Sequence, residues 1–259
     1  MTIPAFTLAR RLRAGETVFS AWCSLPYPIV AEMLGREGFA AVTLEAQHGL
    51  WDTASLLTGV AAVRQAGVAP IVRVPVNDFA LASRVLDFGA EALIAPMINT
   101  AADARAFAAA AKYPPVGERS WGPHRATILA GLADQSVYLR EANEHVITLA
   151  MIETGTALGN VEAILETPGI DGVFVGPSDL SIALSHGKNL DPLAKDVDHA
   201  IDRVAAAADK AGRIPGAFCH TAERAVALGK RGVRFLAVMS DLALLRAGAA
   251  AALKVLKQS

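Results

Sequence analysis

Residues 146–179, VITLAMIETGTALGNVEAILETPGIDGVFVGPSD, contain one complete strand–helix–strand unit and show how this chain is built. Two apolar runs, Val146–Ile152 and Gly172–Val175, flank a helical pattern over Leu158–Glu166. Each run is nearly continuously apolar and does not alternate with polar residues, which is typical of strands in a parallel sheet covered on both faces. The unit therefore predicts a parallel α/β fold.

The same unit recurs along the whole chain, and no linker-like stretch divides the repeats. We expect strands at Val18–Trp22, Ala40–Leu44, Pro70–Val74, Ala92–Pro96, Val146–Ile152, Gly172–Val175, Ile214–Ala217 and Arg234–Val238. The helical patterns cover Ile29–Arg36, Thr53–Gln65, Ala80–Phe88, Ala101–Lys112, Leu158–Glu166, Val197–Ala211, Ala222–Lys230 and Leu242–Leu256. A (β/α)8 barrel typically uses roughly 250 residues, so we predict a single TIM-type barrel domain over residues 1–259.

An open, doubly wound sheet is the competing architecture. Such folds usually have about five or six strand–helix units and often carry a GxGxxG motif after the first strand. This chain has eight units and lacks that motif at that place. The barrel is therefore favoured.

Composition excludes several classes of protein. Hydrophobic residues make up 53% of the chain, but no apolar run reaches the roughly 18–20 uncharged residues of a membrane span. The 24 basic and 25 acidic residues are evenly spread and give a net charge of −1, which predicts no nucleic-acid partner. Two lone cysteines, Cys23 and Cys219, and an N-terminal stretch, Met1–Arg13, without an apolar core predict a cytoplasmic protein.

Polar side chains follow several of the predicted strands. In a TIM barrel the carboxyl ends of the strands form the working face, so residues at these places are candidates for chemistry. They are Trp22, Glu45, Gln47, His48, Arg73, Glu153 and Asp179. Two carboxylates, an imidazole and a guanidinium at one rim indicate an active site.

Glu153 and Asp179 follow neighbouring core strands, so we expect their carboxylates to lie close together. Two close carboxylates repel each other unless a cation or a proton lies between them. Hard oxygen ligands suit Mg²⁺ or Mn²⁺, with water and substrate oxygens completing the coordination shell. The alternative is that Glu153 pairs with a basic residue of the barrel and that Asp179 caps the next helix.

His48 and Arg73 supply the other functional groups. An imidazole titrates near neutral pH, so His48 is the candidate general base. Five other histidines have no comparable setting in the sequence: His124, His145, His186, His199 and His220. Arg73 offers a fixed positive charge to a carbonyl or enolate oxygen, and a salt bridge to Glu45 is compatible with that role. The Gly-Pro-Ser-Asp segment that starts at Gly176 presents backbone N–H groups at a helix start, which can bind a carboxylate.

Two segments depart from the regular spacing. Tyr113–Arg140 is longer than an ordinary connection and is expected to be a functional or partner-contacting loop. Ser185–Pro192 is a polar loop after the sixth strand. No lysine lies at a predicted strand end, so a Schiff-base mechanism is not expected.

Several motifs, taken together and in order, resemble those of the HpcH/HpaI aldolase family from about Gly15 to Leu245. They are Ala31–Phe39, Glu45–Gly49 (EAQHG), Val72–Asp78 (VRVPVND), Leu86–Met97 (LDFGAEALIAPM), Tyr113–Pro123 (YPPVGERSWGP), Ile152–Thr154 and Gly172–Ser181 (GVFVGPSDLS). The resemblance implies a class II pyruvate aldolase with a TIM barrel. It also implies a divalent metal, Mg²⁺, Mn²⁺ or Co²⁺, held by Glu153 and Asp179.

The resemblance further assigns roles to individual residues. It implies that His48 is the base, polarised by Asp87, and that Arg73 stabilises the enolate. Gly176 and the amides of Ser178 and Asp179 would bind the 2-oxo acid, and Trp22 and Phe218 would line the pocket. The family pattern also implies a homo-oligomer, a hexamer built as a dimer of trimers, with C-terminal helices exchanged between subunits.

The chain departs from the family pattern at three places. Glu45 and Gln47 replace an aspartate and a glutamate before His48, and Met151 replaces a glutamine two residues before Glu153. Met151 and Phe218 make the site more apolar. The reaction expected from the resemblance is reversible cleavage of a 4-hydroxy-2-oxo acid to pyruvate or hydroxypyruvate and an aldehyde.

Two other functions remain open from the sequence. One is an acyl-CoA lyase of the citrate lyase β-subunit type, for which Lys112, Arg119 and Arg125 offer few basic groups to bind the CoA phosphates. The other is a non-catalytic barrel that binds a metabolite.

Overall fold

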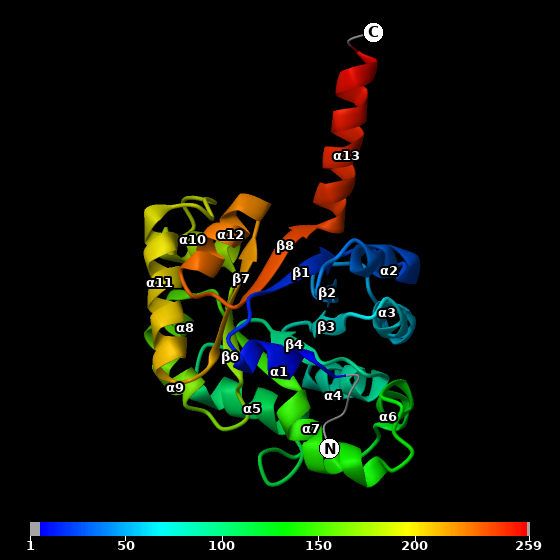
Figure 1. The fold of residues 1–259 in the computed structure, drawn as a ribbon. Coiled ribbons are helices and arrows are strands. Elements are labelled where there is room, and N and C mark those ends of the chain that lie inside the picture. Colours follow the sequence, from blue (N-terminus) through cyan, green and yellow to red (C-terminus); the bar gives the residue numbers. More distant parts are fainter. Residues whose placement is uncertain (1–5, 258–259) are drawn as a thin grey trace.

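Eight parallel strands close into a barrel in the order β1 to β8 in the computed structural model, which describes residues 6–257 (Figure 1). Each strand pairs with its neighbour in sequence, and β8 pairs with β1 to complete the ring. The predicted TIM-type barrel is therefore confirmed, and the open sheet is excluded. Met1–Ala5, the beginning of the N-terminal stretch considered above, lie outside the described residues.

The strands and helices of the described chain alternate as predicted, with additional helices between them. The strands are β1 (Val18–Cys23), β2 (Ala41–Glu45), β3 (Ala69–Arg73), β4 (Ala92–Ala95), β5 (Ile147–Ile152), β6 (Gly172–Val175), β7 (Ile214–Cys219) and β8 (Phe235–Ser240). The helices are α1 (Leu8–Arg13), α2 (Pro28–Arg36), α3 (Thr53–Gln65), α4 (Phe79–Phe88), α5 (Ala101–Ala111), α6 (His124–Leu129), α7 (Gln135–His145), α8 (Gly155–Gly159), α9 (Val161–Leu165), α10 (Pro177–Leu184), α11 (Lys195–Lys210), α12 (Ala222–Lys230) and α13 (Asp241–Leu256).

Some of the predicted boundaries were wrong. The segment Tyr113–Arg140, expected to be a loop, contains α6 and the first half of α7. The single helix expected over Leu158–Glu166 is two short helices, α8 and α9, which meet at Asn160. Strand β7 continues two residues beyond its predicted end and stops at Cys219.

The helix after β6 starts at Pro177. Gly176 is the N-cap of α10, so Ser178 lies one residue inside the helix and does not cap it. Asp78 caps α4, because its side chain accepts a hydrogen bond from the backbone N–H of Leu81 at 2.9 Å.

The barrel interior is filled by side chains from alternate positions of the strands, in layers from the amino to the carboxyl end. Helix α1 lies under the amino end, where Leu8 and Leu12 join the same apolar cluster as Val18. The uppermost interior positions belong to Trp22, Met151 and other residues of the carboxyl end. The amino end is thus closed by protein, and only the carboxyl end is open to a ligand.

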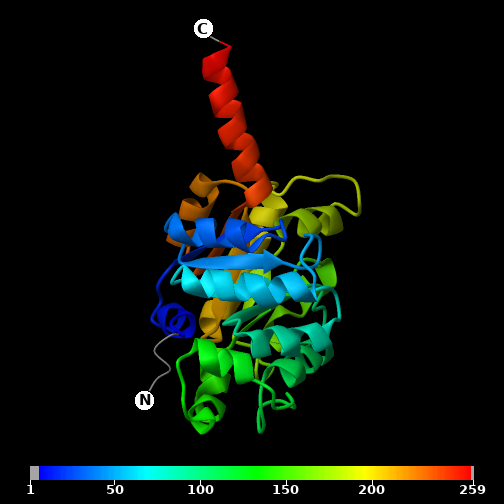
Figure 2. The same ribbon diagram turned by 90° about the vertical axis from the view of Figure 1, so that its right-hand side faces the viewer.

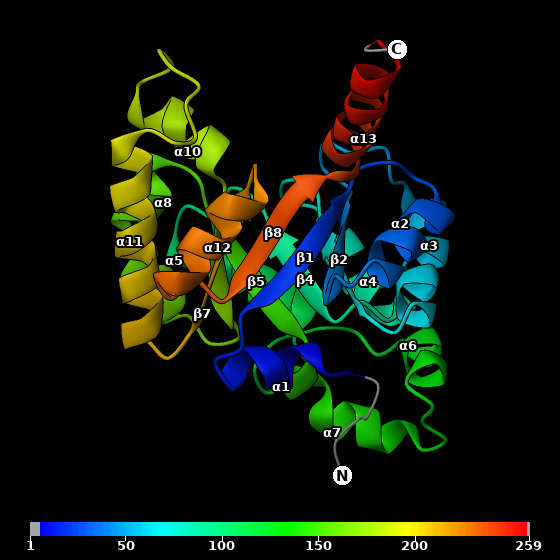
Figure 3. The same cartoon turned by 45° about the horizontal axis from the view of Figure 1, so that its top comes forward.

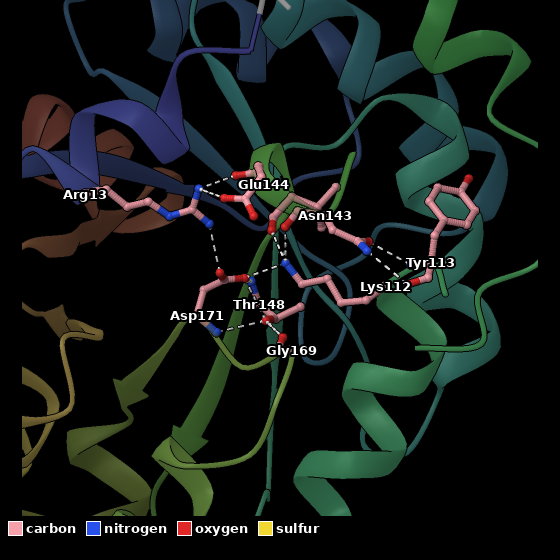
Figure 4. A network of polar contacts seen from close by, with 9 residues as sticks. Arg13, Lys112, Tyr113, Asn143, Glu144, Thr148, Gly169 and Asp171 are labelled. Carbon is pink, nitrogen blue, oxygen red and sulfur yellow. Dashed lines mark hydrogen bonds and ion pairs between the residues drawn. The ribbon is translucent and has the colours of Figure 1, made fainter. Parts of the chain in front are cut away.

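A buried ion-pair network lies beside the amino ends of β5 and β6 (Figure 4). The ammonium group of Lys112 donates to the carbonyl oxygens of Asn143 (2.9 Å) and Val146 (2.5 Å) and to the Asp171 carboxylate (2.7 Å). Arg13 also contacts Asp171, at 3.0 Å. Burial lowers the pKa of Lys112, while Asp171 opposes that change. All three protons of the ammonium group are thus engaged, and the network ties α1, α5, α7 and β6 together.

Helix α13 leaves the barrel and projects beyond it (Figures 1 and 2). Its first residue, Asp241, is buried and accepts hydrogen bonds from the backbone N–H groups of Ser24 (3.0 Å) and Leu25 (2.8 Å), which anchors the helix start. Asp241 is also the only buried residue among the described residues of this helix. No helix of the described chain is long and apolar enough to cross a membrane.

No helix among residues 6–257 crosses the outer face of β1 and β8, between α12 and α2 (Figure 3). In an ordinary (β/α)8 barrel the last helix would complete the outer ring here. A groove of about 320 Å³ lies at this place instead, lined chiefly by apolar residues that include Phe19, Phe39 and Val226.

Candidate active site

A pocket of about 210 Å³ opens at the carboxyl end of the barrel. It is lined by Trp22, His48, Arg73, Met151, Phe174, Gly176, Pro177, Ser178, Asp179 and Phe218. The structure therefore brings together, from six different strands and their following loops, most of the residues that the sequence singled out. The lining also contains Phe174, which was not predicted as a site residue.

Glu45 organises one side of this pocket. Strands β2 and β3 pair with Glu45 opposite Arg73, so both side chains enter the interior at the same level. One carboxylate oxygen of Glu45 accepts a hydrogen bond from Arg73 Nε at 2.5 Å. The other accepts from the backbone N–H groups of Gln47 (2.7 Å) and His48 (3.0 Å). The expected Glu45–Arg73 salt bridge is present, and the same carboxylate also fixes the turn that carries His48.

Arg73 remains able to bind a ligand despite this salt bridge. Its side chain is buried, its Nη1 atom lies 3.8 Å from the Met151 sulfur, and its guanidinium carbon lies 5.1 Å from the centre of the Trp22 ring. A thioether is a weak acceptor and an aromatic ring is an uncharged one, so neither neutralises the arginine. The guanidinium therefore presents a fixed positive charge to the pocket.

Glu153 follows β5, and Asp179 lies in the first turn of α10. Asp179 lines the pocket, whereas Glu153 lies against Gly176 of the pocket lining. Glu153 is 2% exposed, and one of its oxygens accepts a hydrogen bond from the Met97 backbone N–H at 2.7 Å. Burial raises the pKa of Glu153, and the negative charge of Asp179 raises it further, while the Met97 hydrogen bond and Arg73 lower it. The negative charge of Asp179 therefore acts on Glu153, and the role of the pair as metal ligands stays a prediction.

The donor set at Glu153 and Asp179 fits a divalent cation. A Cβ atom at position 176 would lie only 2.7 Å from the second carboxylate oxygen of Glu153. Because Gly176 has no side chain, this oxygen stays accessible. Asp179 is exposed, and its carboxylate accepts no hydrogen bond from the described residues. No third acidic, histidine or cysteine side chain of the described chain joins this pair. Two carboxylates with free oxygens suit an octahedral ion whose other positions belong to water and substrate.

The alternative roles considered for these two acids receive no support. Glu153 hydrogen-bonds a backbone amide and no basic side chain among the described residues. Asp179 lies in the first turn of α10 without making a capping hydrogen bond. Neither carboxylate is therefore satisfied by an ordinary structural partner.

His48 lines the pocket and is exposed to solvent, which is compatible with proton exchange. The predicted partner of His48, Asp87, is held instead by Arg119, whose Nη2 atom lies 2.6 Å from a carboxylate oxygen. No hydrogen bond joins Asp87 to His48 within the described part of the chain. The pairing of Asp87 with His48 therefore stays a prediction.

Aromatic side chains form the remaining wall. Trp22 stacks on Phe174 with 6.1 Å between ring centres and meets the edge of Phe218 at 5.3 Å. Trp22 and Phe218 both line the pocket, and their role in binding a substrate stays a prediction. Phe174 was missed because it lies inside a strand, whereas the sequence argument considered residues after strands.

His220 is a second site residue that was not predicted from the sequence. This residue directly follows β7, and its Nε2 atom lies 3.2 Å from the hydroxyl of Ser178. The strand was predicted to end at Ala217, so His220 did not appear to follow a strand. With the observed end at Cys219, the rule that identified Glu153 identifies His220 as well.

Two of the basic residues considered for CoA binding are unavailable for it. Lys112 is buried in the network at the amino end of the barrel, and the Arg119 side chain is fully buried against Asp87. Only Arg125 of the three is exposed. The supply of cations for CoA phosphates is therefore smaller than the sequence suggested.

Comparisons with known proteins agree with this geometry. Residues 19–247 match the family model described as HpcH/HpaI aldolase/citrate lyase. The hydroxypyruvate/pyruvate aldolase of Rhizorhabdus wittichii is 40% identical over 91% of this chain and 92% of its own length. The 5-keto-4-deoxy-D-glucarate aldolase of Klebsiella pneumoniae is 36% identical over 91% of this chain and 90% of its own length.

A solved structure shows the same likeness. The crystal structure of an HpcH/HpaI aldolase/citrate lyase family protein from Burkholderia cenocepacia superimposes with a TM-score of 0.88 at 31% identity. The match covers 97% of this chain and 99% of that one. Fold, pocket and sequence therefore agree that the chain belongs to the HpcH/HpaI aldolase/citrate lyase family.

Proposed function

We propose that this chain is a metal-dependent aldolase. It cleaves a 4-hydroxy-2-oxo acid, reversibly, to pyruvate or hydroxypyruvate and an aldehyde. The observation that carries the proposal is the pocket lining, which contains buried Arg73 and exposed Asp179, with Glu153 directly beside Gly176 of the same lining. Each carboxylate keeps an oxygen that accepts no hydrogen bond from the described residues. The names of the similar aldolases support the same reaction class.

The 2-oxo acid is bound by groups of opposite character. Its carboxylate lies at the start of α10, where the backbone N–H groups of Ser178 and Asp179 have no partner in the preceding turn. Its carbonyl oxygen lies near Arg73, whose fixed charge stabilises the negative charge that develops there as the bond breaks. Trp22 and Phe218 exclude water from this side of the substrate.

Glu153 and Asp179 would hold a divalent ion such as Mg²⁺, Mn²⁺ or Co²⁺. When bound, the ion supplies Lewis-acid stabilisation of the negative charge on the carbonyl oxygen.

His48 removes the proton from the 4-hydroxyl group in the cleavage direction and returns it in the synthetic direction. Glu45 fixes the backbone of the turn on which this imidazole lies and also orients Arg73, so one carboxylate positions the base and the cation together. Breaking the C3–C4 bond leaves the electron pair on the enolate of the 2-oxo acid and releases the aldehyde.

The direct test is an aldol assay on the purified protein. Pyruvate or hydroxypyruvate is incubated with Mn²⁺ and simple aldehydes, and products are identified by NMR. Formation of a 4-hydroxy-2-oxo acid is expected. A protein that binds pyruvate but forms no aldol product and exchanges no C3 protons with deuterated water would be a binding barrel, and the proposal would be wrong.

We also propose that the protein is a homo-oligomer, with a hexamer of exchanged C-terminal helices as the expected form. Leu245, Leu253 and Leu256 are exposed on the projecting helix α13. The groove over β1 and β8 is lined chiefly by apolar residues, and we propose that it contacts the apolar side chains of such a helix from a second subunit. Sedimentation of the full chain and of a chain ending before Asp241 tests this assembly. The two buried, unpaired cysteines support a cytoplasmic location.

A further inference from the structure

A second imidazole lies at the mouth of the pocket, away from His48. His220 Nε2 lies 3.2 Å from the Ser178 hydroxyl, and the His220 ring meets the edge of Phe218 with 5.0 Å between ring centres. Ser178 and Phe218 both line the pocket. His220 therefore touches two pocket residues from the solvent side, where it is exposed.

The two imidazoles occupy different sides of the mouth. His48 follows β2 and His220 follows β7, and β1 and β8 lie between these strands in the closed ring. A substrate that enters the pocket therefore passes between them. One imidazole is sufficient for the proton transfer in the proposed reaction, so His220 is available for another task.

The polar groups deeper in the pocket are already assigned in the proposed function, on which this inference rests. Arg73, the α10 amides and the two carboxylates contact the 2-oxo acid and the ion. The side walls are apolar, formed by Trp22, Phe174 and Phe218. The aldehyde part of the substrate must extend outward past Phe218, where the next hydrogen-bonding side chains on this side are Ser178 and His220.

We propose that Ser178 and His220 form a hydrogen-bonding subsite that selects aldehydes carrying a hydroxyl group next to the carbonyl carbon. The hydroxyl group of such an aldehyde exchanges its bonds to water for bonds to this pair. An aldehyde with a methyl group in the same place leaves Ser178 and His220 without that hydrogen bond. The enzyme therefore favours the hydroxylated aldehyde over the methylated one.

The state of the imidazole suits this role. Partial burial lowers the pKa of His220, so the ring is neutral at pH 7. A neutral imidazole has one donor and one acceptor nitrogen. It can therefore bond to the Ser178 hydroxyl through one nitrogen and to a substrate hydroxyl through the other, without a preference for charged aldehydes.

The test compares two aldehydes of nearly equal shape, glycolaldehyde and propionaldehyde, with saturating pyruvate and Mn²⁺. The measured quantity is the ratio of kcat/KM for glycolaldehyde to kcat/KM for propionaldehyde. His220→Phe keeps a ring against Phe218 but removes both nitrogens. We expect the ratio to fall about 3- to 10-fold, the worth of one net hydrogen bond, mainly through a higher KM for glycolaldehyde.

Further variants separate this role from a structural one. His220→Gln restores a side-chain donor and acceptor and is expected to recover part of the ratio, while Ser178→Ala is expected to lower it as His220→Phe does. His199→Ala removes an exposed imidazole from the outer helix α11 and is the matched control, with an unchanged ratio expected.

The outcomes distinguish the two proposals. An active His220→Phe protein with the ratio of the unaltered chain would overturn the role of His220 and leave the aldolase proposal intact. A lack of product from the unaltered chain with both aldehydes would overturn the aldolase proposal, and this inference with it.

Discussion

Two polar clusters lie at opposite ends of the same barrel, and they differ in how completely their hydrogen bonds are satisfied. At the amino end, Lys112 uses all three of its protons within the protein, and Asp171 is contacted by Lys112, Arg13 and Thr148 (Figure 4). At the carboxyl end, Arg73 has one strong partner, Glu153 has one hydrogen bond, and Asp179 has none among the described residues.

This difference indicates that the amino-end cluster stabilises the fold and that the carboxyl-end cluster binds a ligand or ion. A closed network leaves nothing for a ligand and holds several elements together. An open set of charges is costly for the protein alone, because buried charges without full partners are destabilising. Such a cost is expected where a ligand or ion completes the set. The following predictions, from the largest effect to the smallest, test whether the two clusters differ in this way.

Removal of divalent ions should have the largest effect. Aldol activity is expected to disappear in EDTA and to return with Mg²⁺, Mn²⁺ or Co²⁺, because Glu153 and Asp179 would be left to repel each other without the ion. Activity that survives EDTA and is trapped by borohydride would instead indicate a Schiff base on a lysine.

His48→Ala should lower kcat by about 10²–10⁴-fold, the usual contribution of a general base. The fold should be unaffected, since this side chain is exposed. Steady-state kinetics with circular dichroism measures both. Removal of the exposed imidazole of His186 is the control, and equal rates for the two variants would exclude His48 as the base.

Lys112→Met should act on stability and leave the chemistry unchanged. It removes one partner of a buried ion pair and leaves two backbone carbonyls without a donor, so a loss of about 3–5 kcal/mol in the free energy of unfolding is expected. Urea denaturation measures it, and Lys210→Met, at an exposed position of α11, is the matched control. A lowered kcat in the folded variant would contradict the separation of the two clusters.

Glu153→Gln should increase the stability of the protein in the absence of metal. The amide keeps an oxygen for the Met97 N–H but removes a buried negative charge, so a gain of about 1 kcal/mol, or about 2–4 °C in Tm, is expected for a chain of this size. Thermal unfolding in EDTA measures the gain, and calorimetry with Mn²⁺ should show weakened binding. A variant less stable than the parent would show that Glu153 is already satisfied by the protein.

Much of the fold and the site was predictable from local patterns. Continuous apolar strands alternating with helices predicted the barrel, and the residues directly after strands predicted His48, Glu153 and Asp179. The rule failed where a strand end was placed too early, as at His220, and where a site residue lies inside a strand, as at Phe174. It also gave no sign that Tyr113–Arg140 contains helices, because polar residues obscure the periodicity of a short amphipathic helix.

The sequence by itself determined the kind of barrel and the end at which the chemistry lies, because strand periodicity and the direction of parallel strands are local properties. The tertiary structure alone decided which charges are paired. Lys112 with Asp171, Arg119 with Asp87 and Ser178 with His220 are separated by 59, 32 and 42 residues. Such contacts depend on the register around the closed ring, and no local pattern specifies that register.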